Sequence, residues 1–147
     1  MRENPDIFAL TGDLGYIGFD KIRDDFPDRF INCGASEFAM LGIACGLALE
    51  GKTPFVYSIT SFLLYRAFEM IRTYIDHESI PVILIGSGRN NDYKHDGFSH
   101  FAGDDKDFMQ NFKNIQSRWP ESSAVMDVII REAIRNRKPY YINLKRG

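Results

Sequence analysis

The sequence predicts an α/β fold in which a mostly parallel sheet carries helices on both faces, giving three layers. Short apolar runs typical of strands alternate along the chain with segments of helical periodicity, and this alternation favours a parallel sheet. The run at residues 80–86 is almost continuously apolar, as is typical of a strand that is covered on both sides.

Length and composition are those of one domain, which we expect to cover residues 1–147. The chain is 44% hydrophobic and 14% aromatic, enough to bury a core. Its 18 Lys and Arg are dispersed, and the net charge is −2, which argues against a nucleic-acid-binding face. The longest apolar run, residues 38–49, is too short to span a bilayer, and the N-terminus lacks a signal-peptide pattern. Cys33 and Cys45 lie in apolar surroundings, so we expect a reduced, cytoplasmic protein without membrane contacts.

The first half of the chain contains three predicted strands and two predicted helices. The strands are residues 6–10, 29–32 and 53–58, and a glycine-containing loop at 11–15 follows the first of them. A weak helix at 18–26 is stopped by Pro27. A stronger helix covers residues 37–50, with Ser36 as its N-cap and Gly51 at its end.

The second half continues the alternation. Aromatic and aliphatic residues recur at three- and four-residue spacing over 60–77, which predicts one long helix there. The strand at 80–86 leads into a long polar loop at 87–103, and loops of that length are usually functional or disordered. A short helix at 104–112, a brief strand at 114–117, a helix at 121–137 and a last strand at 139–144 complete the prediction.

The helix at 37–50 is apolar nearly all the way round, which is unusual for a helix on the surface of a monomer. Gly42 and Gly46 lie four residues apart, so another backbone can approach closely on that side. Glu37 is the only charge near its start. Either this carboxylate simply favours the positive end of the helix dipole, or it is buried and pairs with a partner group.

Polar and aromatic residues gather where the predicted strands end. Asp13, Glu37, residues 58–62 and the loop at 87–103 all follow the carboxyl end of a strand. Ligands of open parallel sheets bind beyond that edge. We therefore expect the functional site there.

Several motifs together resemble the pyrimidine-binding domain of the transketolase-like, thiamine diphosphate-dependent enzymes. The longest match covers residues 29–72, with a Gly-x-x-Glu turn at 34–37, a helix of small residues, and an aromatic-led helix after residue 58. Residues 11–14 (TGDL) resemble the family's Asp-Leu loop, residues 96–100 (DGFSH) its Asp-Gly-Pro-Thr-His motif, and the ending PYYINLKRG its closing strand. The resemblance covers nearly the whole chain.

The resemblance implies residues that contact the cofactor. Glu37 matches the glutamate that hydrogen-bonds the aminopyrimidine ring and activates thiamine diphosphate. Phe62 matches the ring that stacks on the aminopyrimidine; a plain core position is the alternative, and Tyr65 or Phe68 would take the stacking role if the alignment shifted. Asp13 and Leu14 match a loop beside the cofactor; an ordinary Asx turn is the alternative for Asp13.

The resemblance also implies residues that contact the substrate. Asp96 and His100 match positions facing its hydroxyl and carbonyl groups, where a histidine can relay a proton near neutral pH; a surface-loop histidine is the alternative. Two positions depart from the family. Gly88 stands near a family histidine, and Trp119 stands where the family has a phosphate-binding arginine, with Arg118 displaced by one residue.

A partner chain is implied as well. The family's Gly-Asp-Gly motif and its downstream Asn, which hold Mg²⁺ and the diphosphate, have no counterpart here, and no metal ligand is expected in this chain. The diphosphate-binding and C-terminal domains also have no counterpart. We therefore expect a pyrimidine-binding subunit of a split enzyme, in a heterotetramer that transfers a two-carbon ketol or acyl unit between sugars or from a 2-oxo acid. The alternatives are a β-type subunit of a 2-oxo acid decarboxylase or dehydrogenase, a non-catalytic scaffold, and an unrelated nucleotide- or flavin-binding module. The last alternative is disfavoured because no phosphate-binding glycine motif follows any predicted strand of this chain.

Overall fold

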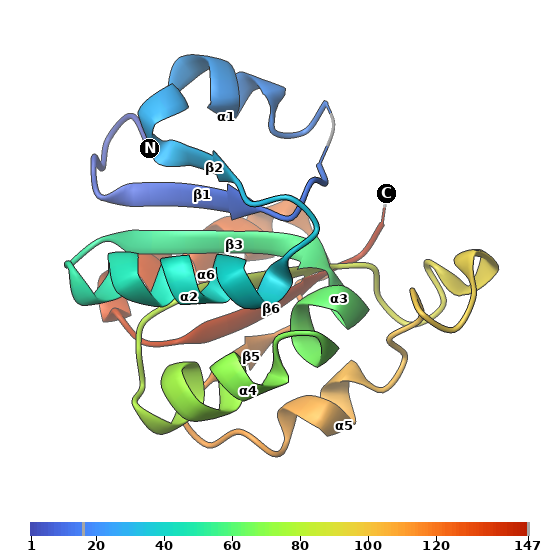
Figure 1. The fold of residues 1–147 in the computed structure, drawn as a ribbon. Coiled ribbons are helices and arrows are strands. Elements are labelled where there is room, and N and C mark those ends of the chain that lie inside the picture. The colour runs from blue at the N-terminus through green and yellow to red at the C-terminus, as the bar shows by residue number, and fades with distance from the viewer. Residues whose placement is uncertain (16, 147) are drawn as a thin grey trace.

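The computed structural model describes residues 1–15 and 17–146, and a parallel sheet runs through its centre (Figure 1). Within these residues the sheet has six strands in the order β2-β1-β3-β4-β6-β5, and every neighbouring pair is parallel. The strands are β1 (Ile7–Thr11), β2 (Phe30–Asn32), β3 (Thr53–Ile59), β4 (Ile83–Ser87), β5 (Gln116–Arg118) and β6 (Tyr140–Leu144). The predicted parallel sheet is confirmed.

Helices cover both faces of this sheet, which confirms the three layers. One face carries α2 (Glu37–Leu49), α3 (Thr60–Tyr65), α4 (Phe68–Met70), the π-helical segment η2 (Ile71–His77) and α5 (Asp105–Met109). The other face carries α6 (Ser123–Asn136), and α1 (Asp20–Asp25) lies on the same side, beyond β1. Two short 3₁₀ turns, η1 (Pro27–Arg29) and η3 (Lys94–Asp96), complete the elements.

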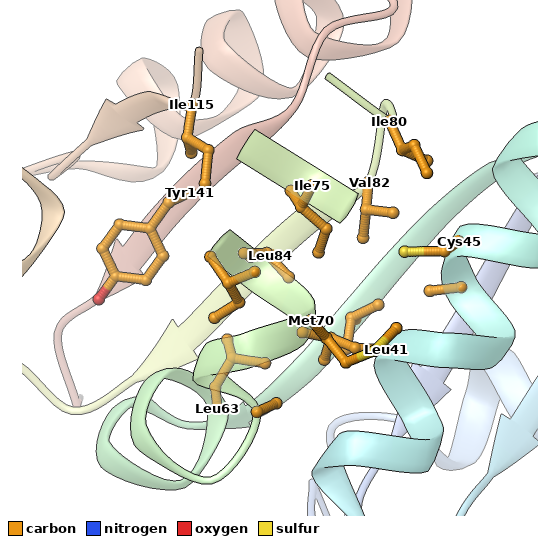
Figure 2. Packing of buried hydrophobic residues seen from close by; sticks show 14 of the residues in the cluster. Leu41, Cys45, Leu63, Met70, Ile75, Ile80, Val82, Leu84, Ile115 and Tyr141 are labelled. Carbon is orange, nitrogen blue, oxygen red and sulfur yellow. The ribbon is translucent and has the colours of Figure 1, made fainter. Parts of the chain in front are cut away.

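The sheet separates two hydrophobic clusters because successive side chains of a strand point to opposite faces. In β4, Leu84 joins the larger cluster under α2, whereas Ile83 and Ile85 join the smaller cluster under α6. Figure 2 shows Leu41 and Cys45 of α2 directed toward Met70 and Val82 in the larger cluster. All five residues of β4 are buried, which explains why this segment reads as an apolar run.

The helix predicted over residues 60–77 is not continuous. Ala67 leaves helical geometry, with φ −113° and ψ 24°, and the chain resumes as α4 and the π-helical η2. The break lets Tyr65 and Phe68 both contact the ring of Phe108 on α5. Packing on α5 therefore overrides the helical periodicity that the sequence shows.

Other boundaries lie within three residues of their predicted positions. The largest change in a strand is at β4, which begins at Ile83 because Val82 N–H donates to the Ile80 carbonyl in a tight turn across Pro81. Ser36 does precede α2, but its side chain accepts no hydrogen bond from the helix. Ser36 is the N-cap residue as predicted, and its carbonyl rather than its hydroxyl bonds to the helix, accepting from Met40 N–H at 2.9 Å.

One side of α2 remains uncovered by the described residues. We call it the open face of α2; it consists of Phe38, Ile43, Gly46 and Leu49. Leu49 is 71% exposed and Phe38 49%. A methyl group built on Gly46 would meet nothing within 4 Å, and one on Gly42 only the terminal methyl of Met70 at 3.8 Å. No backbone among residues 1–15 and 17–146 makes the close approach predicted at these glycines.

Candidate functional site

The carboxyl ends of β1, β3 and β4 bring the predicted functional segments to one edge of the sheet. The loop at residues 12–15 follows β1, α3 follows β3 directly, and the long loop at 88–104 follows β4. Glu37 reaches the same edge from the start of α2, after the short turn that follows β2. This arrangement is the one that parallel βα units impose, because all of their strands end on the same side.

Glu37 is a buried charged residue at this edge, and its side chain is 1% exposed. Its Oε1 accepts a hydrogen bond from Ser58 Oγ at 3.0 Å, and its Oε2 accepts one from Arg66 Nη1 at 3.1 Å. Gly12 lies against the same carboxylate: a Cβ at that position would stand 3.4 Å from Oε1. The carboxylate is thus a constrained acceptor in a crowded site, and it does more than favour a helix dipole.

Phe62 is linked to this carboxylate through Arg66 and offers an aromatic face. The guanidinium carbon of Arg66 stands 3.7 Å from the centroid of the Phe62 ring. The imidazole of His100 meets the same ring edge-on, with 4.8 Å between centroids. Arg66 thus joins Glu37 to Phe62, and His100 contacts the same ring.

His100 is held where the long loop returns to α3. Ser61 Oγ donates to the Ser99 carbonyl at 2.7 Å, which ties the loop to the first turn of α3. The Ser99 hydroxyl and His100 Nδ1 are 3.0 Å apart. Within residues 1–15 and 17–146, Nδ1 is the nitrogen of this half-buried imidazole that is engaged in a hydrogen bond.

Asp13 and Leu14 lie in the loop after β1 and follow Gly12, the glycine next to the Glu37 carboxylate. Asp13 has φ 59°, and its N–H and carboxylate are both bonded to the Asn32 side chain, at 3.0 and 3.2 Å. The Leu14 carbonyl accepts from Thr11 Oγ1 at 2.9 Å. These contacts fix the loop after β1 with Asp13 exposed at its tip.

Three other predicted site residues lie apart from this group. Tyr65 points toward α5, where its hydroxyl donates to Asp104 at 2.5 Å; burial and that carboxylate raise the pKa of Tyr65. Asp96 is exposed at the end of η3, 3.3 Å from His95. Arg118 lies over the Tyr140 ring, on the side of the sheet that α6 covers.

Sequence reasoning missed the two side chains that bond to Glu37. It included Ser58 only as part of a segment, and it did not single out Arg66. Helical spacing could have indicated that Arg66 lies near Phe62, because residues four apart share a helix face and Arg66 follows Phe62 by four.

A buried polar network at the two ends of the long loop was missed as well. At its start, Arg89 is 4% exposed and bonds to the side chain and carbonyl of Asn143, to the Pro120 carbonyl and to Glu121. At its end, Asp105 accepts from Trp119 Nε1 and the Tyr141 hydroxyl at 2.8 and 2.9 Å. Burial, followed by the Asp105 charge, raises the pKa of Tyr141. Trp119 therefore has a structural contact where the family pattern has a phosphate-binding arginine.

The remaining titratable groups point to no metal centre. Within residues 1–15 and 17–146, no three His, Cys, Asp or Glu side chains are grouped as metal ligands would be. Burial raises the pKa of the Cys45 thiol to about 11, and that of Cys33 is likewise raised.

No helix within residues 1–15 and 17–146 combines the length and apolar character that crossing a membrane requires.

The sequence matches the family model "Transketolase, pyrimidine binding domain" over residues 1–147. It is 35% identical over 120 residues to an apulose-4-phosphate transketolase subunit of Actinobacillus succinogenes, a match that covers 82% of this chain and 39% of that protein. It is 30% identical over 146 residues to a putative transketolase C-terminal section of Methanocaldococcus jannaschii, covering 99% of this chain and 46% of that protein.

The fold has a close counterpart among solved structures. A split-gene transketolase, described as an inactive beta4 tetramer, superposes with a TM-score of 0.86 at 32% identity, over 99% of this chain and 47% of that one. The chain thus spans less than half the length of each of these relatives. The shared region contains the whole sheet and the edge that carries Glu37.

Proposed function

Because this chain belongs to the transketolase pyrimidine-binding domain family, we propose that it is the pyrimidine-binding part of a split, thiamine diphosphate-dependent transketolase-like transferase. The observation that carries the proposal is the buried Glu37 carboxylate at the carboxyl edge of the sheet, which Arg66 joins to the Phe62 ring. Relatives named as transketolase subunits favour this function over a 2-oxo acid dehydrogenase subunit.

The residues of this edge fit the aminopyrimidine half of the cofactor. When bound, thiamine diphosphate supplies a nucleophilic carbon and an electron sink. Glu37 would hydrogen-bond a ring nitrogen through Oε2 and exchange a proton with it, while Ser58 holds Oε1 in place. Phe62 would stack on the ring. Gly12 leaves space beside the carboxylate.

We propose that His100 contacts the substrate. Its imidazole adjoins Phe62 and would donate a hydrogen bond to, or move a proton at, a hydroxyl of a sugar substrate. Asp13 and Leu14 would lie beside the cofactor, in the loop after β1. Asp96, in the long loop that also carries His100, would contact the substrate. Tyr65 and Arg118 receive structural roles, in keeping with their contacts to Asp104 and Tyr140.

A partner chain completes the proposal. Mg²⁺ prefers carboxylate and carbonyl oxygens as ligands, and the described residues of this chain contain no group of such side chains. We therefore assign Mg²⁺ and the diphosphate to a partner that carries the diphosphate-binding domain. Relatives named as a transketolase subunit and as a C-terminal section support a divided enzyme, in which a heterotetramer is our expectation. Two free thiols, Cys33 and Cys45, support a cytoplasmic location.

Calorimetric titration of thiamine diphosphate with Mg²⁺ tests the proposal, on this chain alone and on its complex with the partner. We expect binding only in the complex, and we expect Glu37→Ala to weaken it roughly 10- to 100-fold by removing a charged hydrogen bond. Glu50→Ala, at the exposed end of the same helix, is the matched control. Tight binding by the chain alone, or an unchanged affinity in Glu37→Ala, contradicts the proposal.

The open face of α2 is the proposed contact with that partner. Ile43→Ser should weaken assembly at least about tenfold, because polar substitution at the centre of an apolar interface removes burial of that side chain. The fold should survive, since Ile43 is 43% exposed in the isolated chain. Val128→Ser, which changes an exposed side chain of α6, should leave assembly unchanged. Sedimentation velocity measures both; equal weakening by the two variants would place the interface elsewhere.

A further inference from the structure

The guanidinium of Arg66 lies between the two side chains that the proposed function assigns to the aminopyrimidine. Its carbon stands 3.7 Å from the centroid of Phe62, and its Nη1 donates to Glu37 Oε2 at 3.1 Å. These are the same two contacts, one to a ring face and one to a carboxylate oxygen, that an aminopyrimidine would make there.

The two groups are alike in shape and chemistry. A guanidinium is flat and delocalised, stacks on aromatic faces, and presents N–H donors along its edge. Ser58 donates to Oε1 and Arg66 to Oε2, so an aminopyrimidine that approaches Oε2 from the Phe62 side meets the guanidinium. A separation of 3.7 Å is van der Waals contact, so no second flat group fits between Arg66 and Phe62. The two groups therefore exclude each other from this face of Phe62.

The contact has a physical reason in the isolated chain. The Glu37 side chain is 1% exposed, and a buried carboxylate without a partner is costly. The Arg66 side chain is 48% exposed, and Arg66 is the C-cap residue that follows α3, immediately before the break at Ala67. Arg66 can therefore move into water, whereas Glu37 cannot.

We propose that Arg66 is an internal placeholder, which compensates Glu37 and covers Phe62 until an aminopyrimidine displaces it. This inference rests on the proposed function. Arg66 is a positioning residue: it keeps the carboxylate paired while the site is empty, at the cost of competing with the ligand. If Arg66 occupies the position roughly nine-tenths of the time, the apparent dissociation constant of an aminopyrimidine rises about tenfold.

The test is a titration of 4-amino-5-hydroxymethyl-2-methylpyrimidine, the aminopyrimidine fragment alone, into the chain, followed by saturation-transfer NMR. We expect Arg66→Ala to bind the fragment about tenfold more tightly than the wild type. Arg72→Ala, an exposed arginine of the following segment, should match the wild type. Adding Phe62→Ala to Arg66→Ala should abolish the gain, which a general loosening of the fold would not do.

A second measurement needs no variant. In the wild-type chain the Phe62 ring current should shift the side-chain protons of Arg66 upfield, and saturating fragment should return them to ordinary values. Binding of the fragment with the Arg66 signals unmoved overturns the placeholder.

The outcomes separate the inference from the proposed function. Equal or weaker binding by Arg66→Ala, with binding still dependent on Phe62, overturns the placeholder and leaves the aminopyrimidine site standing. Absence of Phe62-dependent binding in every variant overturns both, since the vacated position then does not accept the group.

Discussion

Glu37→Gln is expected to slow the assembled enzyme at least about 100-fold, the lower range for loss of a general acid–base group. Glutamine keeps the size of the side chain, and its oxygen can still accept from Ser58. It cannot exchange a proton with a ring nitrogen. The ion pair with half-exposed Arg66 is lost as well, but the cost of burying a charged carboxylate is lost with it, so we expect stability to change little.

Two measurements separate a chemical defect from a folding defect. Proton exchange at the reactive carbon of the bound cofactor, followed in D₂O, should slow in parallel with turnover, while the melting temperature changes little. Glu50→Gln, exposed at the end of the same helix, should leave both rates unchanged. Undiminished exchange in Glu37→Gln would remove Glu37 from cofactor activation.

Arg89→Met is expected to lower the free energy of unfolding by about 3 kcal/mol, because it leaves buried acceptors without donors. Arg89 donates to the Asn143 side chain and carbonyl at 3.1 and 2.6 Å and to the Pro120 carbonyl at 2.9 Å. Methionine fills a similar volume but donates nothing. The lost bonds hold the start of the loop at 88–104, which returns to α3 with His100.

Urea denaturation measures the loss, and hydrogen exchange should show faster opening of the amides at residues 88–104. The control is Arg135→Met, an exposed arginine of α6, for which we expect a change within about 0.5 kcal/mol. A loss below about 1 kcal/mol in Arg89→Met would mean that water replaces the arginine, and that the network does not anchor the loop.

The order of strands and helices was predictable because it depends on local patterns. Apolar runs and turn residues are properties of short segments, and the parallel sheet follows from their alternation. The same holds for the edge that carries Glu37, since parallel strands all end on one side. The break at Ala67 was not predictable, because it depends on contacts with Phe108, which lies far along the chain from Tyr65 and Phe68.

The sequence by itself determined the fold class, the resemblance to a pyrimidine-binding domain and the candidate residues Glu37 and Phe62. Only the tertiary structure decided what surrounds them: Ser58 and Arg66 on the carboxylate, His100 against the ring, and Tyr65 and Arg118 directed elsewhere. The physical reason is range. Periodicity acts over a few residues, whereas a hydrogen bond to a buried carboxylate joins residues 21 or 29 positions apart, whose meeting depends on how the sheet brings its edges together.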